Sequence, residues 1–293
     1  MRIVPGEIQT AALHGYLLGS IGPRPICFAS TIDENGLPNL SPFSFFNVFG
    51  SKPPIVVFSP ARRVRDNSTK HTLQNALLNG EVVINIVNYD LVQQVNLSSC
   101  EYPKGINEFE KAGLTAIASE FVKPFRVKES PVQLECKVLQ ILETGQEGGA
   151  GNLIICEVLC MHLHDEILDA SGKIDPHKID LVARMGGDYY CRASGNAVFE
   201  VQKPNLNLGI GVDALPTTIR KSSVLTGNNL GVLGNSTSIP IISDVLYDDR
   251  LMQILRDYEH DQEAKVNALH IYAKELIEVG ATEKAWQVLL SGE

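Results

Sequence analysis

No apolar run in the sequence approaches the roughly 20 residues that a membrane-spanning helix needs. The first residues, MRIVPGEIQTAALHGYLLGS, include an early proline and glycine and lack the apolar core and small-residue cleavage site of a secretory signal peptide. The formal net charge of −9 disfavours nucleic acid or an anionic membrane as the main partner. These absences predict a cytoplasmic protein without a nucleic-acid or membrane partner.

Paired cysteine motifs are also missing. The six cysteines are scattered and none belongs to a C-x-x-C pair, which indicates reduced, packed thiols rather than a disulfide framework or a zinc site. His162 and His164 alternate on an expected strand and face one side, but half-exposed strand histidines explain them better than metal ligands do. We expect neither a metal site nor a catalytic thiol.

The sequence lacks the fingerprints of several enzyme classes. LGIGV (208–212) contains G-x-G but no third glycine, no strand-to-helix context and no acidic partner, so it does not predict a dinucleotide site. Neither a P-loop nor a G-x-S-x-G nucleophile motif occurs. No acid–base pair or nucleophile stands out either, so a catalytic role would rest on the chemistry of a bound cofactor.

Short apolar stretches separated by turn signals fill the first two thirds of the chain. They lie at 25–31, 41–50, 53–59, 81–87, 132–144 and 152–164. The last two flank the turn GQEGGAG and predict a long hairpin. We expect one helix at 68–80, starting close to Ser68 or Thr69, and another near 88–99. The pattern predicts a β-barrel or sandwich with added helices.

The composition changes after about residue 195. Residues 205–240 are rich in glycine, asparagine, serine and threonine, which predicts an irregular arm. From about residue 244 onward, apolar residues recur three and four positions apart, which predicts helices. We therefore expect a β domain at 1–200, an irregular arm at 201–243 and a helical extension at 244–293. A lone helical hairpin cannot bury its apolar face, so the extension should pack on the barrel or on a second subunit.

A basic loop follows the strand at 53–59, which ends at Ser59. Its cations are Arg62, Arg63, Arg65 and Lys70. A helix N-terminus presents unpaired N–H groups and a partial positive charge, and the loop adds full charges and hydroxyl donors, which together favour a phosphate. A solvated basic loop without a ligand explains the same residues equally well.

Two further stretches suit a flat ligand. In PNLSPFSFFNVFG (38–50), polar residues spaced three apart stand beside phenylalanines and offer a stacking surface with hydrogen-bonding groups at its edge. In LVARMGGDYYC (181–191), Gly186 and Gly187 let the backbone approach a ligand, with Arg184 and Tyr189 beside them. On composition alone, a core strand and a tight turn are the favoured interpretations of these two stretches.

Taken together, the motifs resemble the flavin reductase-like proteins with an FMN-binding split barrel, close to the flavoredoxin branch. The resemblance covers roughly residues 15–200. It is carried, in this order, by GPRPICFAST (22–31), PNLSPFSFFNV (38–48), VVFSPARR (56–63), STKHTLQN (68–75), EVVINIV (81–87), VNLSSCEYPKGINEFEKAGLT (95–115) and KIDPHKIDLVARMGGDYY (173–190). It implies a mainly β fold with added α: an FMN-binding split β-barrel, here followed by the irregular arm and the helical extension.

The resemblance implies an FMN site with NAD(P)H as co-substrate and no catalytic side chain. The residues matched to the phosphate site are Ser59, Arg62, Lys70 and Thr72. The residues matched to the ring and ribityl chain are Ser30, Thr31, Ser44, Phe46 and Asn47, to which we add Gly187 and Tyr189 from the glycine-rich turn. The family commonly has an acidic residue where His71 stands here. Such proteins are usually homodimers with the site near the subunit interface.

Two functions follow from this resemblance. The first, which we predict, is an enzyme in which NAD(P)H reduces FMN and FMN reduces a flavin or another acceptor, with the chemistry at the flavin N5. The second is an FMN-binding electron carrier, like flavoredoxin, that a protein partner reduces. A third possibility is a structural barrel that binds no flavin.

Overall fold

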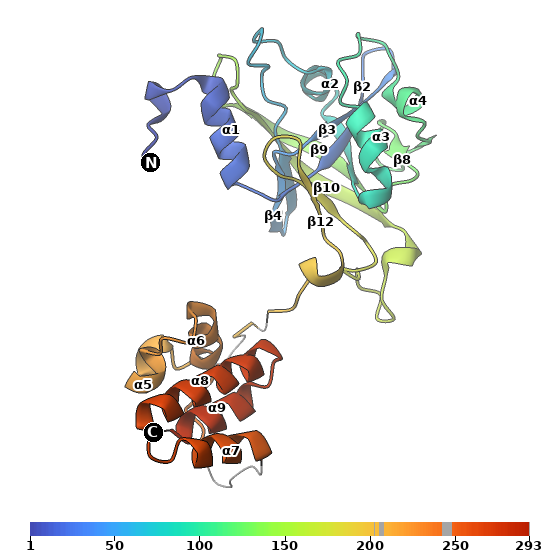
Figure 1. Cartoon of the computed structure of the whole chain (residues 1–293). Helices are drawn as coiled ribbons and strands as arrows, with labels where there is room; N and C mark the ends of the chain where they lie inside the picture. Colours follow the sequence, from blue (N-terminus) through green and yellow to red (C-terminus); the bar gives the residue numbers. More distant parts are fainter. Residues whose placement is uncertain (202, 205–207, 242–247, 293) are drawn as a thin grey trace. The chain divides into compact units, whose positions relative to one another are not determined.

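The computed structural model describes residues 1–201, 203–204, 208–241 and 248–292 (Figure 1). Contacts within the chain divide it into unit 1, Met1–Phe199, and unit 2, Glu200–Glu293. Strands form the centre of unit 1, whereas the regular elements described in unit 2 are all helices. Among the described residues, no helix is both long enough and apolar enough to cross a membrane.

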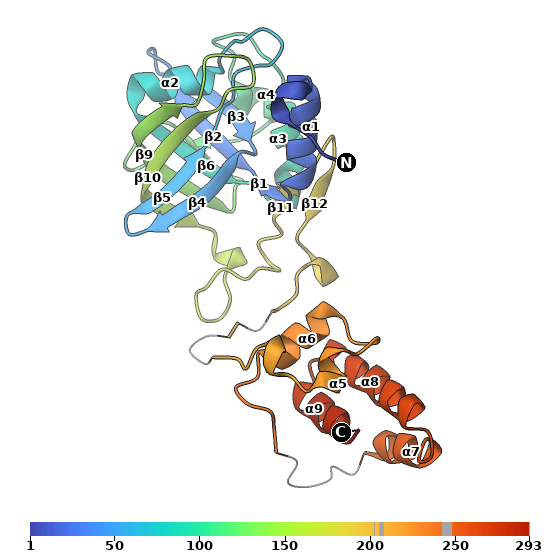
Figure 2. The same ribbon diagram turned by 90° about the vertical axis from the view of Figure 1, so that its left-hand side faces the viewer.

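A seven-stranded antiparallel sheet curls around the core of unit 1 (Figure 2). Its strands, in chain order, are β2 (Cys27–Ile32), β3 (Pro38–Phe43), β4 (Phe46–Ser51), β5 (Pro54–Phe58), β6 (Glu81–Ile86), β9 (Val132–Glu143) and β10 (Asn152–Leu163). Their spatial order is β3-β2-β6-β9-β10-β5-β4. The predicted long hairpin is confirmed as β9 and β10, which pair from end to end. The predicted fold class, a mainly β split barrel with added helices, is confirmed as well.

The barrel is split because its edge strands, β3 and β4, each pair with one neighbour and not with each other. These two strands are consecutive in the sequence, so Ser44 and Phe45 alone connect the two edges. We call this connection the seam. The single apolar stretch predicted at 41–50 is therefore two strands with the seam between them.

The outer edge of β3 offers few backbone donors. Pro38 and Pro42 have no N–H group, and the N–H of Leu40 between them donates to Glu108 Oε2 at 3.1 Å. Glu108 is buried, and burial raises the pKa of its carboxyl group. A side chain from α4 (Glu108–Ala112) thus takes the place that a further strand would occupy.

Helix α2 (His71–Asn79) packs against the interior of the barrel. Its Leu73 and Ala76 join the core that also contains Cys27 and Ala29 of β2. The helix begins later than predicted, because the expected caps have other partners. Ser68 Oγ bonds to Asp66, Thr69 Oγ1 accepts from Gln74, and no side chain caps the helix start.

The other face of the sheet carries a second core, in which Phe28 and Leu40 pack with residues of α3 and α4. Figure 1 shows these helices on the side of the strands opposite to α1. The predicted helix near 88–99 is confirmed as η2 followed by α3. The smaller elements of unit 1 are η1 (Pro5–Glu7), α1 (Thr10–Ser20), β1 (Arg24–Pro25), η2 (Tyr89–Leu91), α3 (Val92–Leu97), β7 (Ala116–Ile117), β8 (Arg126–Val127), η3 (Asp165–Ile167), β11 (Val182–Arg184), β12 (Tyr190–Arg192) and η4 (Gly195–Ala197).

Unit 2 buries its apolar side chains within itself. Its described elements are η5 (Val212–Ala214), α5 (Thr217–Arg220), α6 (Gly227–Gly234), α7 (Asp249–Asp257), α8 (Gln262–Glu278) and α9 (Thr282–Leu290). Ile219 and Leu233, which fall in the predicted irregular arm, are fully buried in one core with Leu269 and Trp286 of the helical extension. The described part of the arm is therefore partly helical. The arm therefore covers apolar side chains of the extension, a contact that the sequence did not predict. The expected packing of the extension on the barrel or on a second subunit stays a prediction.

The helices predicted from residue 244 onward are confirmed as α7, α8 and α9. The first residues of that prediction, 244–247, lie outside the described residues.

Candidate functional site

The seam gathers several of the residues predicted to contact a ring. Ser44 lies in the seam, Phe46 begins β4 directly after it, and both are half-buried, whereas Asn47 is exposed. The N–H of Ser59 donates to Phe45 O at 2.8 Å, which places the end of β5 beside the seam. Ser59 itself is buried. The structure thus brings together predicted residues from two separate stretches of the sequence.

The basic loop after Ser59 is less positive than its sequence indicates. Arg63 Nε and Arg65 Nη2 each lie 2.8 Å from a carboxylate oxygen of Glu101, so these two cations already have a partner. Arg62 is held more weakly, at 3.7 Å from Glu143, and its Nε is buried without a hydrogen-bond partner among the described residues. The prediction that the four cations form one anion site stays a prediction, and in the structure two of them, Arg63 and Arg65, are paired with Glu101.

Lys70 differs from the other loop cations. Its half-buried ammonium group has no hydrogen bond or salt bridge within the part of the chain that the structure describes. Burial, and next the nearby Arg63 guanidinium, lower the pKa of Lys70, and the same two causes lower the pKa of His71. Both residues stand at the uncapped start of α2. A half-buried charge without a counter-ion beside free helix N–H groups favours an anion.

Two buried hydrogen bonds join α2 to the sheet and hold two of the predicted residues. Asn75 Nδ2 donates to Thr31 Oγ1 at 3.1 Å, and Asn39 Nδ2 donates to Thr72 Oγ1 at 3.0 Å. Because each threonine acts as an acceptor here, its own hydroxyl hydrogen is left for another partner. Thr31 and Thr72 therefore lie in one polar layer under α2.

Ser30 lies on the opposite side of the sheet from this layer. Neighbouring strand residues point to opposite faces, so Ser30 faces the core that contains Phe28 and Leu40. It is fully buried, and its Oγ has no hydrogen-bond partner among the described residues. The structure does not bring the Ser30 side chain together with that of Thr31.

Helix α1, which the sequence analysis did not predict, connects the seam to the glycine-rich turn. The His14 ring meets Phe45 edge-on with ring centroids 6.2 Å apart. At the other end of the helix, a Cβ added to Gly186 would lie 2.9 Å from Gly19 Cα, so a larger residue would push the two segments apart. No residue of α1 is buried, although most of its side chains are apolar.

Gly187 and Tyr189 lie in the turn between β11 and β12. Gly187 has a φ of +59°, which favours glycine, and its carbonyl accepts from Arg184 Nη2 at 2.9 Å. Tyr189 is 77% exposed. The contacts described above connect this turn to the seam through α1. Gly187 and Tyr189 thus form a second group, apart from the residues around α2 and the seam.

Several residues that organise the site from a distance were not predicted from the sequence. Asn39 and Asn75 hold the two threonines, Glu101 neutralises the loop arginines, and the backbone N–H of Asn152 donates to Ser59 Oγ at 3.0 Å. Isolated asparagines inside apolar stretches were the available signal. Their partners lie in other elements, so sequence spacing does not identify them.

The described residues contain no cluster of His, Cys, Asp and Glu suited to a metal ion. His162 Nε2 instead lies 2.7 Å from Oε1 of Glu135, a fully buried carboxylate that also accepts backbone N–H groups from 120–122. Glu135 therefore anchors a loop to the sheet. The site around α2 and the seam has donors for an anion and an aromatic surface, but no nucleophile set against a base.

Known proteins resemble the chain over unit 1. Residues 19–177 match the model of the flavin reductase like domain. An uncharacterized protein of Aquifex aeolicus is 37% identical over 201 residues, which is 69% of this chain and 100% of that protein.

Two solved structures are similar to the chain. Nitrilotriacetate monooxygenase component B from Bacillus cereus is 29% identical, with a TM-score of 0.64, over 69% of this chain and 98% of that one. A Shewanella frigidimarina protein with a split barrel domain is 26% identical, with a TM-score of 0.58, over 68% of this chain and 95% of that one.

Proposed function

Because the chain belongs to the flavin reductase-like family, we propose that unit 1 binds FMN and carries electrons through it from NAD(P)H to a flavin or another acceptor. Membership places the chain among proteins of flavin redox chemistry. The more specific proposal rests on the start of α2, where Lys70 forms no salt bridge within the described residues and no side chain caps the helix. These features suit the phosphate that distinguishes FMN from riboflavin.

The residues of unit 1 divide the work of holding FMN. Lys70, Thr72 and the first N–H groups of α2 would bind the phosphate, together with Ser59 and Arg62. Ser44 of the seam and Phe46 directly after it would lie against the ring, since Phe46 supplies an aromatic surface and Ser44 a hydroxyl group. Thr31 would donate its free hydroxyl hydrogen from under α2.

When bound, FMN would supply the redox chemistry, namely the transfer of a hydride from NAD(P)H and of two electrons to the acceptor. The protein residues bind and orient the reactants, and none has to donate or accept a proton at a reacting atom.

Two measurements test the proposal. Titration of the protein with FMN and with riboflavin should show tighter binding of FMN. Addition of NADH or NADPH without oxygen should then bleach the absorbance of the bound flavin. Reduction by a protein donor alone would instead identify an electron carrier. Equal affinity for the two flavins would contradict the phosphate site, and failure to bind either would leave a structural barrel.

We also expect a homodimer. Tyr16, Leu17 and Ile21, in and just after α1, are 47%, 48% and 62% exposed, and apolar groups of this size favour a covered position. Light scattering should give twice the chain mass of 32.0 kDa. A single-chain mass at micromolar concentration would contradict this expectation.

A further inference from the structure

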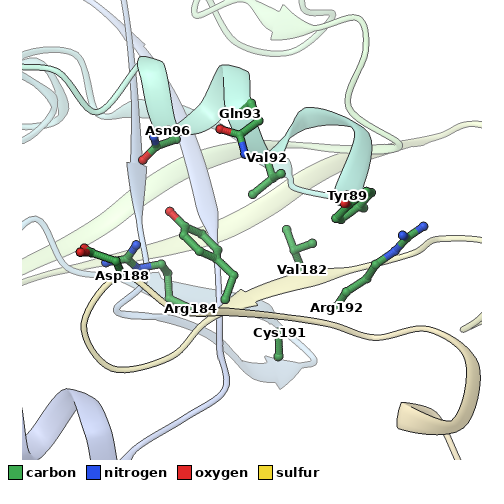
Figure 3. A pocket seen from close by; sticks show the side chains of 10 residues that line it. Tyr89, Val92, Gln93, Asn96, Val182, Arg184, Asp188, Cys191 and Arg192 are labelled. Carbon is green, nitrogen blue, oxygen red and sulfur yellow. The ribbon is translucent and has the colours of Figure 1, made fainter.

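A hollow in unit 1 is lined by residues other than those at the start of α2. It has a volume of about 420 Å³ and lies between η2 and α3 on one side and the β11–β12 hairpin on the other (Figure 3). Its polar lining includes Gln93 and Asn96 from α3 and Arg184, Tyr190 and Arg192 from the hairpin. The function proposed above assigns no role to these residues.

The two arginines of the hollow differ in their partners. Arg192 makes two hydrogen bonds to the Asp180 carboxylate, at 2.8 and 2.7 Å, and its guanidinium stacks on the Tyr89 ring. Arg184 stacks on the Tyr190 ring but bonds only to a backbone carbonyl and pairs with no carboxylate among the described residues. Of these two charges, that of Arg184 is the one left without compensation.

A second unpaired guanidinium faces Arg184. Arg24 of β1 is its partner in the β1–β11 register and is 7% exposed. Arg24 donates to the carbonyls of Leu18, Ile21 and Met185, has no carboxylate partner, and keeps a buried Nε without a hydrogen bond within the described residues. Like charges opposite each other in a sheet destabilise it. Burial, and next the charge of Arg184, lower the pKa of Arg24.

The opposite wall of the hollow offers neutral hydrogen-bonding groups. The side-chain amides of Gln93 and Asn96 have no hydrogen bonds to other described residues, and Figure 3 shows them across the hollow from the hairpin. Asp188 also lines the hollow and brings one negative charge. The lining therefore combines an uncompensated guanidinium, amides and an aromatic ring, which are groups that recognise phosphates and nucleotide bases.

We propose that this hollow binds a phosphate-bearing nucleotide, with Arg184 as the anchor for its phosphate. The inference rests on the proposed function and adds a position for the second reactant. Two sources have this chemistry: the nicotinamide nucleotide that donates electrons, and a free flavin nucleotide that accepts them. In either case Arg184 is a binding residue and not a catalytic one.

The test compares Arg184→Gln with wild type as FMN-loaded protein. The control is Arg256→Gln, which removes the same charge from an exposed position in unit 2. We expect Arg184→Gln to raise one KM about tenfold or more, as the loss of a charged hydrogen bond does, with little change in kcat. The KM for NADH will rise if the donor binds here. If the acceptor binds here, the KM for FMN as acceptor will rise, but not that for riboflavin. Arg184→Lys, which keeps the charge, should recover part of the loss.

A direct titration with ADP separates this inference from the proposed function. FMN-loaded wild type should bind ADP or a second equivalent of FMN, and Arg184→Gln should bind the same ligand about tenfold more weakly, even if wild type does not oxidise NAD(P)H. The inference is overturned if neither ligand binds wild type. It is also overturned if Arg184→Gln matches wild type in both KM values and both titrations, or if this variant loses its resident FMN.

Discussion

Unit 1 and unit 2 bury different kinds of side chain. The buried polar residues described in unit 1 include Arg24, Ser30, Thr31, Asn39, Ser59, Thr72, Asn75, Asn85, Glu108, Gln133, Glu135 and Asn152. In the described part of unit 2 they are Asn229, which forms a capping box with Thr226, and His270, which bonds to Ser222. Buried polar groups destabilise a fold unless they are paired. A unit that needs only a core therefore keeps few of them, as unit 2 does.

The unpaired groups sharpen this contrast. Unit 1 leaves Ser30 Oγ, Arg62 Nε and Arg24 Nε buried without partners among its described residues, and it leaves Lys70 and Arg184 without counter-ions. The described residues of unit 2 contribute no atom to the buried unpaired set. The comparison shows where a ligand is expected: in unit 1, where polar groups remain unsatisfied. The described part of unit 2 has an apolar core, and no buried unpaired polar atom in it indicates a bound ligand.

The largest expected effect is a loss of stability in unit 2 without a change in the FMN affinity of unit 1. Leu289 is 2% exposed in the core of unit 2, so Leu289→Ala should lower the free energy of unfolding of unit 2 by about 2–5 kcal/mol. The single tryptophan, Trp286, lies in the same core, so its fluorescence during urea unfolding reports on unit 2. FMN affinity should not change.

Leu208→Ala is the matched control for Leu289→Ala. Leu208 is 91% exposed, so its substitution should change the stability of unit 2 by less than about 0.5 kcal/mol. A loss of FMN affinity in Leu289→Ala would show that the two units do not work independently.

The next largest effect is a loss of FMN affinity in unit 1 without a change in the unfolding transition of unit 2. Lys70→Ala should weaken FMN binding by about 1.5–3 kcal/mol, or ten- to a hundredfold, because it removes a charged contact to the phosphate. Riboflavin affinity and the Trp286 transition should stay as in wild type. Lys128→Ala removes an equal charge from an exposed position of unit 1 and should bind FMN normally. Wild-type FMN affinity in Lys70→Ala would place the phosphate elsewhere.

A smaller effect tests the neutralised part of the basic loop. Glu101→Gln removes the partner of Arg63 and Arg65 and leaves both charges free for a phosphate. The preference for FMN over riboflavin should rise by at most about fivefold, as exposed charge pairs are weak, and it should shrink as salt is added. A fall in FMN preference would mean that Glu101 acts by holding the loop in place.

The smallest effect concerns the pH dependence of unit 2. Ser222 Oγ accepts from the N–H groups of Val224 and Leu225, so its own hydrogen is left for His270 Nδ1, 2.7 Å away. Burial lowers the pKa of His270 from 6.5. The neutral histidine therefore stabilises unit 2 above pH 6.5. That stability is lost as the pH falls through the folded pKa, because the unfolded chain takes up the proton first.

The substitution His270→Asn keeps an acceptor for Ser222 without a titrating ring. It should flatten the decline in the Trp286 unfolding midpoint just below pH 6.5. An equal decline in the variant and in wild type would show that other groups cause it.

The sequence pattern of a segment predicted its secondary structure where the residues of that segment alone determine it. The β9–β10 hairpin follows from two apolar runs around a glycine-rich turn. Helix α1 was missed because its apolar residues and glycines show no one-sided stripe. Helix α6 was assigned to an irregular arm because GNNLGVLG is rich in glycine. Its capping box and the burial of Leu233 make it helical, and burial in a shared core cannot be read from the segment itself.

The same limit explains the site. The sequence located the basic loop and the aromatic stretch, and the structure places Ser59 beside the seam as a consequence of β5 ending there. The sequence did not show which cations remain free, because Glu101, the partner of Arg63, lies 38 positions away in the sequence. It also assigned Ser30 and Thr31 together, although adjacent residues of a strand face opposite sides.

The edge of β3 limits how copies of the protein can assemble. An incoming strand needs donors along that edge, but Pro38 and Pro42 have none and Leu40 has given its N–H to Glu108. Neither β4 of the same barrel nor a strand of another molecule can extend the sheet there by regular backbone pairing. The β3 edge of the barrel is thus protected against the addition of a strand from another copy of the chain.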